Sequence, residues 1–418
     1  MLPSPKQIKI FRHLHDLFCV KDSQGRLLVS RWVSRLLICP SPSPTALAIR
    51  FVHKELVFCL AALAAAISVF FTKPSLSLYL SYIDLRVLEL LFSLMATAAG
   101  LQRVGFFQNL AVHLRRHCRS EACLANLLVL LCFFSAMFIT NDVALIVFVP
   151  FTLQVMRGTS KQRLIFTIVM ETVAANLGSM VTPLGNPQNI FLCSFYNLGL
   201  KQFLTLTIPW GLVSLALIEA SMFIEAKFVT SSTMLSDSCE NELPKLDRAL
   251  LLRYFLCLAL CLLTVAKVVS AHFCASFILI WLLAADRELL KHLDYVLLLT
   301  FVCFFIFVGN TAQVEQVKEW AEYLLTGREL FASALLSQII SNVPAAVMLA
   351  PFTKQSAALL LGVNLGGLGT LVASLASLIS YRLYINGAQA DSKAYLYTFT
   401  VLNFTFLAIL LLLASCLL

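Results

Sequence analysis

The chain has 418 residues, of which 60% are hydrophobic and only 13% are charged, and its mean hydropathy is +0.87. A soluble protein of this length covers itself with polar and charged side chains, so the composition excludes a soluble enzyme, a secreted disulfide scaffold and a disordered chain. The formal charge of +9 then concerns membrane topology, with the anionic cytoplasmic leaflet as its partner and not nucleic acid.

The first 54 residues differ from the rest of the chain. They lack the apolar stretch of a signal peptide and carry many basic side chains, from Lys6 to Lys54. Lys and Arg concentrate on the cytoplasmic side of membrane proteins. Residues 1–54 therefore predict a basic N-terminal arm in the cytoplasm.

Apolar stretches recur along the remaining chain, and a helix needs about 20 apolar residues to cross the hydrocarbon core. The expected crossings are residues 55–73, 82–102, 164–198, 206–224, 250–267, 271–285, 293–310, 356–384 and 395–417. Gly and Pro interrupt 164–198 and 356–384, which predicts two broken helices. The pattern predicts an all-α polytopic membrane protein with about 9–11 transmembrane helices.

Two further apolar stretches, 122–156 and 330–353, have polar, helix-breaking centres. The centres are Thr140, Asn141 and Asp142 in the first stretch, and Ser341, Asn342 and Pro344 in the second. Basic residues flank the first stretch on both sides, so we expect a re-entrant hairpin that opens to the cytoplasm. The acidic loop 311–329 is expected outside, so the second hairpin is expected to open to the external side. The C-terminus is also expected outside.

The two halves of the chain resemble each other. Asn141 and Pro150-Phe151 match Asn342 and Pro351-Phe352 without a gap, and Asn176-Leu-Gly178 with Thr182 matches Asn364-Leu-Gly366 with Thr370. Five crossings separate the starts of the two copies, and an odd number makes them antiparallel, as in the inverted repeats of secondary transporters. The predicted domains are a first repeat over 55–224, a cytoplasmic linker over 225–249 and a second, inverted repeat over 250–418.

The matched polar residues predict one binding region near the middle of the membrane. Broken helices and hairpin tips are tolerated there only where protein or a wet cavity satisfies their backbone, and helix N-termini favour anions. The candidate substrate- or ion-binding residues are Thr140, Asn141, Asp142, Asn176, Gly178, Thr182, Asn186, Asn189, Ser341, Asn342, Asn364, Gly366 and Thr370. The glycines are interpreted as helix breakers, and close helix packing alone is the alternative. Asn141 and Asn342 acting only as helix caps remain an alternative.

Two acidic residues inside apolar runs are candidates for coupling transport to an ion. Asp142 has Val343 as its counterpart in the second copy, so symmetry does not explain it. A carboxylate at that depth needs a cation or a proton, although an N-cap role is the alternative. Glu171 lies five residues before Asn176 and either faces the same cavity or pairs with a scaffold residue.

Three stretches carry a resemblance to a known superfamily. They are Phe138-Ile-Thr-Asn-Asp-Val-Ala-Leu145, Asn176-Leu-Gly-Ser-Met-Val-Thr-Pro-Leu-Gly-Asn-Pro-Gln-Asn189 and Ser341-Asn-Val-Pro-Ala346. They resemble the transporters that include arsenite permeases, sodium/proton antiporters and sodium-coupled dicarboxylate or citrate carriers. The resemblance implies an inverted-repeat carrier with an inner and an outer hairpin. In the dicarboxylate branch, Ser-Asn-Thr tips bind carboxylate and sodium; here Thr140-Asn141-Asp142 and Ser341-Asn342-Val343 stand in their place, and the Asn-Asp pair looks more like the arsenite permeases.

No GxSxG, HExxH, Walker loop or Cys/His metal cluster occurs, so we expect no enzyme, no cofactor and no fixed metal, with sodium or a proton as the coupling ion. The leading reading is a secondary transporter that moves a small anion, a carboxylate or an inorganic oxyanion, by alternating access. A cation/proton antiporter, an arsenite-type efflux permease and a channel are the alternatives. Expected partners are the anion and membrane lipid, with no nucleic acid and with a homodimer left open. The expected location is the bacterial cytoplasmic (inner) membrane.

Overall fold

The computed structural model describes residues 20–21, 27–28, 55–70, 76–115, 118, 120–228, 247–387 and 390–417. The chain divides into two units, Met1–Cys59 and Leu60–Leu418. In the first unit, β1 (Val20–Lys21) pairs antiparallel with β2 (Leu27–Leu28). Most of the predicted arm 1–54, and residues 229–246 of the predicted linker, lie outside the described residues.

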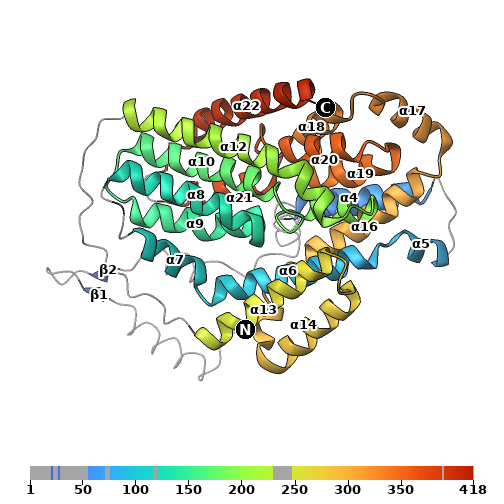
Figure 1. The fold of residues 1–418 in the computed structure, drawn as a ribbon, viewed down its shortest axis with the longest axis horizontal. Coiled ribbons are helices and arrows are strands. Elements are labelled where there is room, and N and C mark those ends of the chain that lie inside the picture. Colours follow the sequence, from blue (N-terminus) through green and yellow to red (C-terminus); the bar gives the residue numbers. More distant parts are fainter. Residues whose placement is uncertain are drawn as a thin grey trace. The chain divides into compact units, whose positions relative to one another are not determined.

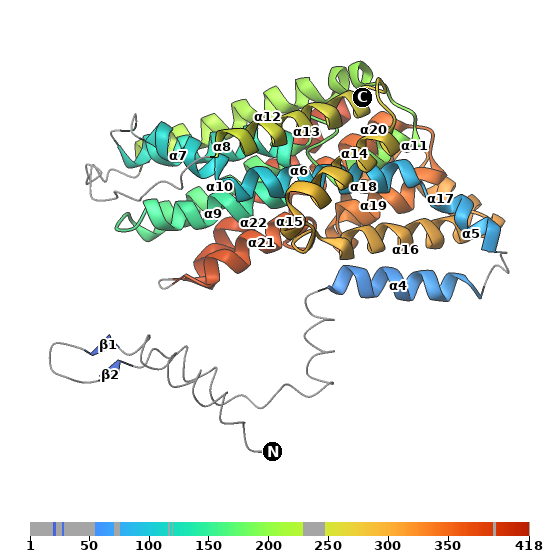
Figure 2. The ribbon, with the colours of Figure 1, turned by 90° about the horizontal axis from the view of Figure 1, so that it is seen from below.

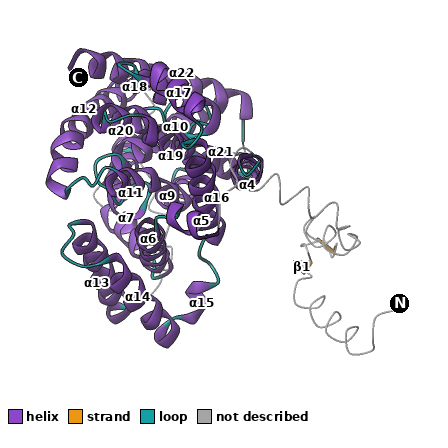
Figure 3. Cartoon of the chain, turned by 90° about the vertical axis from the view of Figure 1, so that its right-hand side faces the viewer, coloured by secondary structure: helices purple, strands orange, loops and turns teal. Residues whose placement is uncertain are grey.

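The second unit is built of helices (Figure 3). Five helices in the described ranges are long and apolar enough to cross a membrane: α6 (Leu85–Arg103), α8 (Glu121–Ile139), α12 (Leu200–Phe228), α13 (Arg248–Val265) and α22 (Ser392–Leu417). A sixth span is counted if α16 (Tyr295–Thr311) and α17 (Glu315–Leu325), which meet at 103°, are taken together. The predicted all-α polytopic membrane class is confirmed, and several predicted crossings consist of shorter or paired helices.

The remaining helices are shorter. They are α4 (Leu56–Ser68), α5 (Leu76–Tyr82), α7 (Phe106–Arg115), α9 (Asn141–Val155), α10 (Lys161–Ser179), α11 (Pro187–Phe195), α14 (Ala271–Ala285), α15 (Arg287–Leu290), α18 (Glu329–Ile340), α19 (Asn342–Leu349), the 3-10 helix η1 (Ala350–Phe352), α20 (Ser356–Leu365) and α21 (Leu375–Ile385). The loop expected over 311–329 is thus largely the helix α17, whose charged residues alternate with Val317, Trp320 and Leu324. Such an amphipathic helix has too few apolar residues for a search based on hydropathy.

Two helix pairs turn back on themselves at matched positions. The pair α8 and α9 meets at Thr140, and the pair α18 and α19 meets at Ser341. Thr140 has φ 72° and ψ 151°, and Ser341 has φ 77° and ψ 154°. Residues with a side chain rarely adopt a positive φ, so its occurrence at both predicted tips indicates that the two turns are built alike.

Each repeat also contains a helix that breaks and resumes. Helices α10 and α11 flank a break at 180–186, and α20 and α21 flank a break at 366–374. Helix α10 packs on α8 of its own repeat, and α20 packs on α18. The helices after the breaks pack on the hairpin of the other repeat: α11 packs on α19, and α21 packs on α9. The two repeats are therefore interlocked at their hairpins (Figure 1).

The polar contacts at the helix ends fall into two opposed groups. At one end, here called end A, Arg163 forms ion pairs with Glu121 and Glu225 at 3.0 Å each, and Lys161 pairs with Asp391. The other end, here called end B, is reached by α12, which starts at Leu200 and carries Glu225 in its last turn.

End B is held together by side-chain contacts to neighbouring loops. Tyr196 donates to the carbonyl oxygens of Ala350 and Thr353, and Thr353 donates to Glu329. Hairpin α8–α9 thus begins and ends at end A, whereas α18–α19 begins and ends at end B. In Figures 1 and 2 the long helices run across the view, with α7 toward one side and α5 and α17 toward the other.

Candidate functional site

Each hairpin tip is bonded to the helix break of its own repeat. The backbone amide of Asn141 donates to the carbonyl oxygen of Gly185 (3.3 Å), and the amide of Asn342 donates to that of Ala373 (2.9 Å). Gly185 and Ala373 each lie three residues after the matched threonines of the two breaks. Two sequence regions that were predicted separately are therefore one structural unit, repeated twice.

The matched threonines make a second equivalent contact. The hydroxyl of Thr182 donates to the carbonyl oxygen of Met137, and the hydroxyl of Thr370 donates to that of Gln338 (2.9 Å). Met137 and Gln338 each lie three residues before the tip. Both threonines thus hold the break against the first arm of the hairpin, which is a scaffold role in this conformation.

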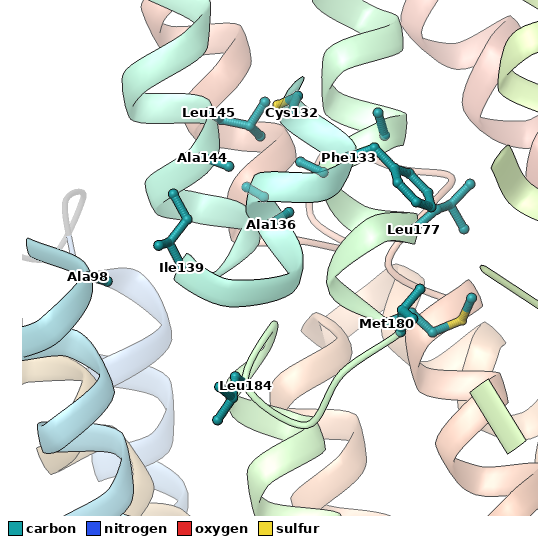
Figure 4. Close-up of a cluster of buried hydrophobic side chains, with 14 of the residues drawn as sticks. Ala98, Cys132, Phe133, Ala136, Ile139, Ala144, Leu145, Leu177, Met180 and Leu184 are labelled. Atoms are coloured by element: carbon teal, nitrogen blue, oxygen red, sulfur yellow. The ribbon is translucent and has the colours of Figure 1, made fainter. Parts of the chain in front are cut away.

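Gly178 and Gly366 allow close packing next to the breaks. Gly178 is the second-last residue of α10, so it lies directly before the break and also at a close contact between helices. A Cβ there would overlap the carbonyl oxygen of Phe133 in α8, and a Cβ on Gly366 would lie 2.8 Å from the Cα of Ala334 in α18. Phe133 and Ala334 each precede their tip by seven residues. The apolar packing around the first tip, with Ala136, Ile139 and Ala144, is seen in Figure 4.

Buried amides and hydroxyls join the first tip to both repeats. Asn141 donates from Nδ2 to Oδ1 of Asn176 (2.9 Å), and Ser374 donates to the same oxygen (2.9 Å). Asn176 in turn donates to Oγ of Ser377 (3.3 Å). The structure therefore brings Asn141 and Asn176 together with two serines of the second repeat.

A matching cluster surrounds Asn364. Its Nδ2 donates to Oδ1 of Asn189 (2.7 Å), and Gln188 donates to its Oδ1 (3.4 Å). Asn186 donates to Ser179 (2.6 Å) and Asn189 to the carbonyl oxygens of Ser179 and Thr182. The side-chain amides of Asn186 and Asn189 thus bond to residues at the start of the first break and hold its two ends together.

Besides Ser179, whose hydroxyl accepts from Asn186, three residues of these clusters were missed from the sequence: Gln188, Ser374 and Ser377. The signal was available for the serines, because extending the repeat alignment beyond Thr370 places Ser374 opposite Asn186 and Ser377 opposite Asn189. Serine was overlooked because it is common in loops and helices of every kind.

Asn342 and Asp142 are the tip residues whose side chains have polar atoms without a hydrogen-bond partner in the described part of the chain. Asn342 is buried, and within the described residues its Nδ2 has no recorded hydrogen bond. Asp142 is half-buried, and the described part of the chain offers its carboxylate no hydrogen bond or ion pair. The amide of Asp142 donates to Oδ1 of Asn141 (2.9 Å). The side chain of the N-cap residue Thr140 makes no capping hydrogen bond to α9, and the Asp142 carboxylate caps no amide in the described part of the chain and is left for another partner.

Glu171 lies apart from the amide clusters, between α10 and α9. It is fully buried, and Thr152 of α9 donates to its Oε1. Its Oε2 has no partner among the described residues. A buried carboxyl group without a counter-charge is costly in its ionised form. Of the two alternatives for Glu171, the structure shows the contact with a scaffold residue, Thr152, on the second arm of the first hairpin.

Four helices, α9, α19, α11 and α21, begin at the two tips and two breaks. Helices α9, α19, α11 and α21 have no side-chain hydrogen bond at the N-cap, which they share with α15, α17, α18 and α20, whereas α6, α8, α10, α13, α14 and α16 each have one. Free N–H groups and the helix dipole make such termini suited to anions. Hydroxyl and carbonyl oxygens nearby are ligands that a hard cation such as sodium accepts. No group of three His, Cys, Asp or Glu residues able to hold a metal occurs in the described ranges.

Comparison with known proteins places the chain among transporters. The sequence profile described as "Citrate transporter" matches residues 45–378. An uncharacterized transporter of Methanocaldococcus jannaschii is 34% identical over 258 residues, covering 61% of this chain and 69% of that protein. The inner membrane protein YbiR of Escherichia coli is 29% identical over 309 residues, covering 72% of this chain and 80% of YbiR. The human P protein is 30% identical over 151 residues, which is 34% of this chain and 17% of that protein.

Proposed function

The chain belongs to the citrate transporter family and is an integral membrane transporter, and we propose that it is a secondary active transporter that moves a small anion by alternating access. The anion is a carboxylate or an inorganic oxyanion, and sodium or protons couple its transport. The observation that carries this proposal is the convergence of four uncapped helix N-termini on two hairpin tips and two breaks.

The polar groups at this centre are neutral and suit a ligand that must also leave. The amide clusters around Asn176 and Asn364 contain no Lys or Arg among the described contacts. A fixed basic residue would hold an anion permanently, whereas neutral donors and helix dipoles bind it weakly enough for release. The missing positive charge is supplied by the coupling ion.

Two carboxyl groups are placed to carry that coupling. Asp142 lies at the first tip with a carboxylate that has no partner among the described residues, and Glu171 is buried against the second arm of the same hairpin. A proton or a sodium ion on either group removes the cost of an isolated charge. Coupling through the first hairpin follows, since the second copy has Val343 in the position of Asp142.

The opposed hairpins support alternating access. One hairpin opens to end A and the other to end B, so a small movement of either pair would expose the centre to one end only. End A carries Arg157, Lys161 and Arg163 around the first hairpin and is assigned to the cytoplasm, with the C-terminus outside. A bacterial cytoplasmic membrane is the location that fits this charge distribution.

The second candidate is a cation/proton antiporter or an arsenite-type efflux permease. The carboxylate of Asp142, which forms no ion pair within the described ranges, favours it, because a carboxylate at the tip binds a cation directly. Uptake into proteoliposomes under an imposed sodium or proton gradient separates the candidates. The screen includes dicarboxylates, citrate, sulfate, arsenite and labelled sodium. Concentrative uptake of an anion supports the proposal, and sodium exchange for protons with no anion required contradicts it.

A further inference from the structure

A cavity of about 460 Å³ opens at end B, apart from the amide clusters. Its walls are the first turns of α6, the break-side half of the first broken helix, and the turn that joins α13 to α14. Pro183 and Ile190 line it from the break and from α11. Pro183 directly follows Thr182, which holds the break against α8. The cavity therefore connects end B with the immediate neighbourhood of the candidate binding region.

The charged groups on the cavity wall are predominantly basic. Lys267 donates to the backbone carbonyl (3.0 Å) and Oδ1 (2.6 Å) of Asn197, two neutral acceptors that leave its charge uncompensated. Arg86 forms no ion pair within the described part of the chain. The one acid on the wall, Glu89, contacts Nδ1 of His272 at 2.9 Å. Arg86 and Lys267, neither in an ion pair within the described residues, thus face a partly enclosed space whose one acid is Glu89, which leaves the wall with a net positive charge.

We propose that this cavity is an electropositive vestibule through which small anions reach the first break from end B. Charge of one sign on the walls of a cleft raises the local concentration of ions of the opposite sign, because the low-dielectric walls focus the field. Arg86 and Lys267 attract the anion and stay outside the binding region, so they do not hold it there. The inference rests on the proposed function only for the charge of the substrate.

Thiol chemistry tests the vestibule without knowledge of the substrate. Ala271 and Cys193 both line the cavity, one as the first residue of α14 and one on α11. In a full-length variant whose other cysteines are replaced, Cys193 or an Ala271→Cys substitution is reacted with an anionic and a cationic methanethiosulfonate of similar size. The ratio of the two rates is divided by the same ratio for free cysteine, which removes the intrinsic reactivity of the thiol and of the reagents.

We expect the normalised ratio to favour the anionic reagent by roughly 3-fold or more at low salt, and to fall toward one when salt is raised. Arg86→Gln and Lys267→Gln are each expected to reduce it by about half or more. Lys201→Gln is the matched control, because Lys201 lies at the same end but does not line this cavity, and it should leave the ratio unchanged.

A ratio equal to that of free cysteine at both positions overturns the proposal, as does a ratio that Lys201→Gln lowers as much as the two cavity variants. Absence of reaction at both positions in folded protein also overturns it, because a vestibule is open to water. The result is independent of transport: an anion preference here together with failure to transport any anion would reject the proposed function and leave the vestibule standing.

Discussion

The side-chain amide of Asn364 donates a hydrogen bond of 2.7 Å to Oδ1 of Asn189, across the boundary between the two repeats. The same contact occurs in the other direction, where Asn176 donates to Ser377. The two pairs are related by the sequence repeat, although one acceptor is an amide and the other a hydroxyl. Each break is therefore bonded to the other repeat, so the two halves of the proposed binding region cannot move independently.

Replacing Gly178 by Ala should destabilise the protein by about 1–3 kcal/mol or prevent folding, because the new methyl group meets the backbone of Phe133, which cannot turn away. Thermal unfolding in detergent measures the effect. Gly199→Ala is the control, since a Cβ there meets nothing within 4 Å. Equal melting temperatures for the two variants would show that α8 and α10 are not in close contact here.

The ion pairs at end A predict that a buried and an exposed basic residue differ in their contribution to stability. Arg163→Met should cost about 3–5 kcal/mol, because it leaves Glu121 and Glu225 buried without their common partner. Lys161→Met, two residues earlier, breaks an exposed pair with Asp391 and should cost about 0–1 kcal/mol. Chemical denaturation of both variants in the same detergent provides the comparison. A smaller loss for Arg163 than for Lys161 would contradict the observed burial.

Asp142→Asn and Glu171→Gln should alter the dependence of transport on ion gradients more than the choice of substrate. The reason is that each change removes a charge but keeps a hydrogen-bonding group of similar shape. Uptake is measured at several sodium concentrations and pH values. If both variants transport normally and respond to sodium and pH as the unaltered protein does, the two carboxyl groups have only structural roles.

Labelling with a membrane-impermeant thiol reagent tests the orientation of the two ends. A single cysteine at Glu319, which is exposed in α17, should react in intact cells, whereas one at Arg157 should react only after permeabilisation. This follows from placing the basic end A in the cytoplasm. Reaction at position 157 in sealed cells would reverse the assignment of both hairpins.

The architecture was accessible from the sequence where the signal was local. Hydropathy and composition gave the membrane class, and the polar interruptions at Thr140 and Ser341 coincide with the two turns because no apolar helix tolerates such residues without a partner. Short amphipathic helices such as α7 and α17 were not predicted, because they have too few apolar residues to stand out in hydropathy. Two statements stay predictions: the hairpins lie within a membrane, and their residues bind substrate.

The side-chain partners were harder to predict, because they depend on how distant segments cross. The contact from Asn176 to Ser377 requires α21 to pack against the hairpin of the other repeat, an arrangement that neither segment encodes alone. The packing contact of Gly178 was hard to predict for a related reason. A glycine next to a break looks like a cause of the break, until the neighbouring helix that needs the space is known.

The central claim is that matched asparagines at the two tips belong to one binding region of an ion-coupled anion carrier. It is tested most directly by gradient-driven accumulation, in proteoliposomes, of the anion identified in the screen, comparing the unaltered protein with Asn141→Ala and Asn342→Ala. Both variants should fold, as judged by their melting temperatures, yet lose at least about 90% of uptake, because each removes a donor from one tip. Normal, concentrative uptake by both folded variants would contradict the account and leave these residues as helix caps alone.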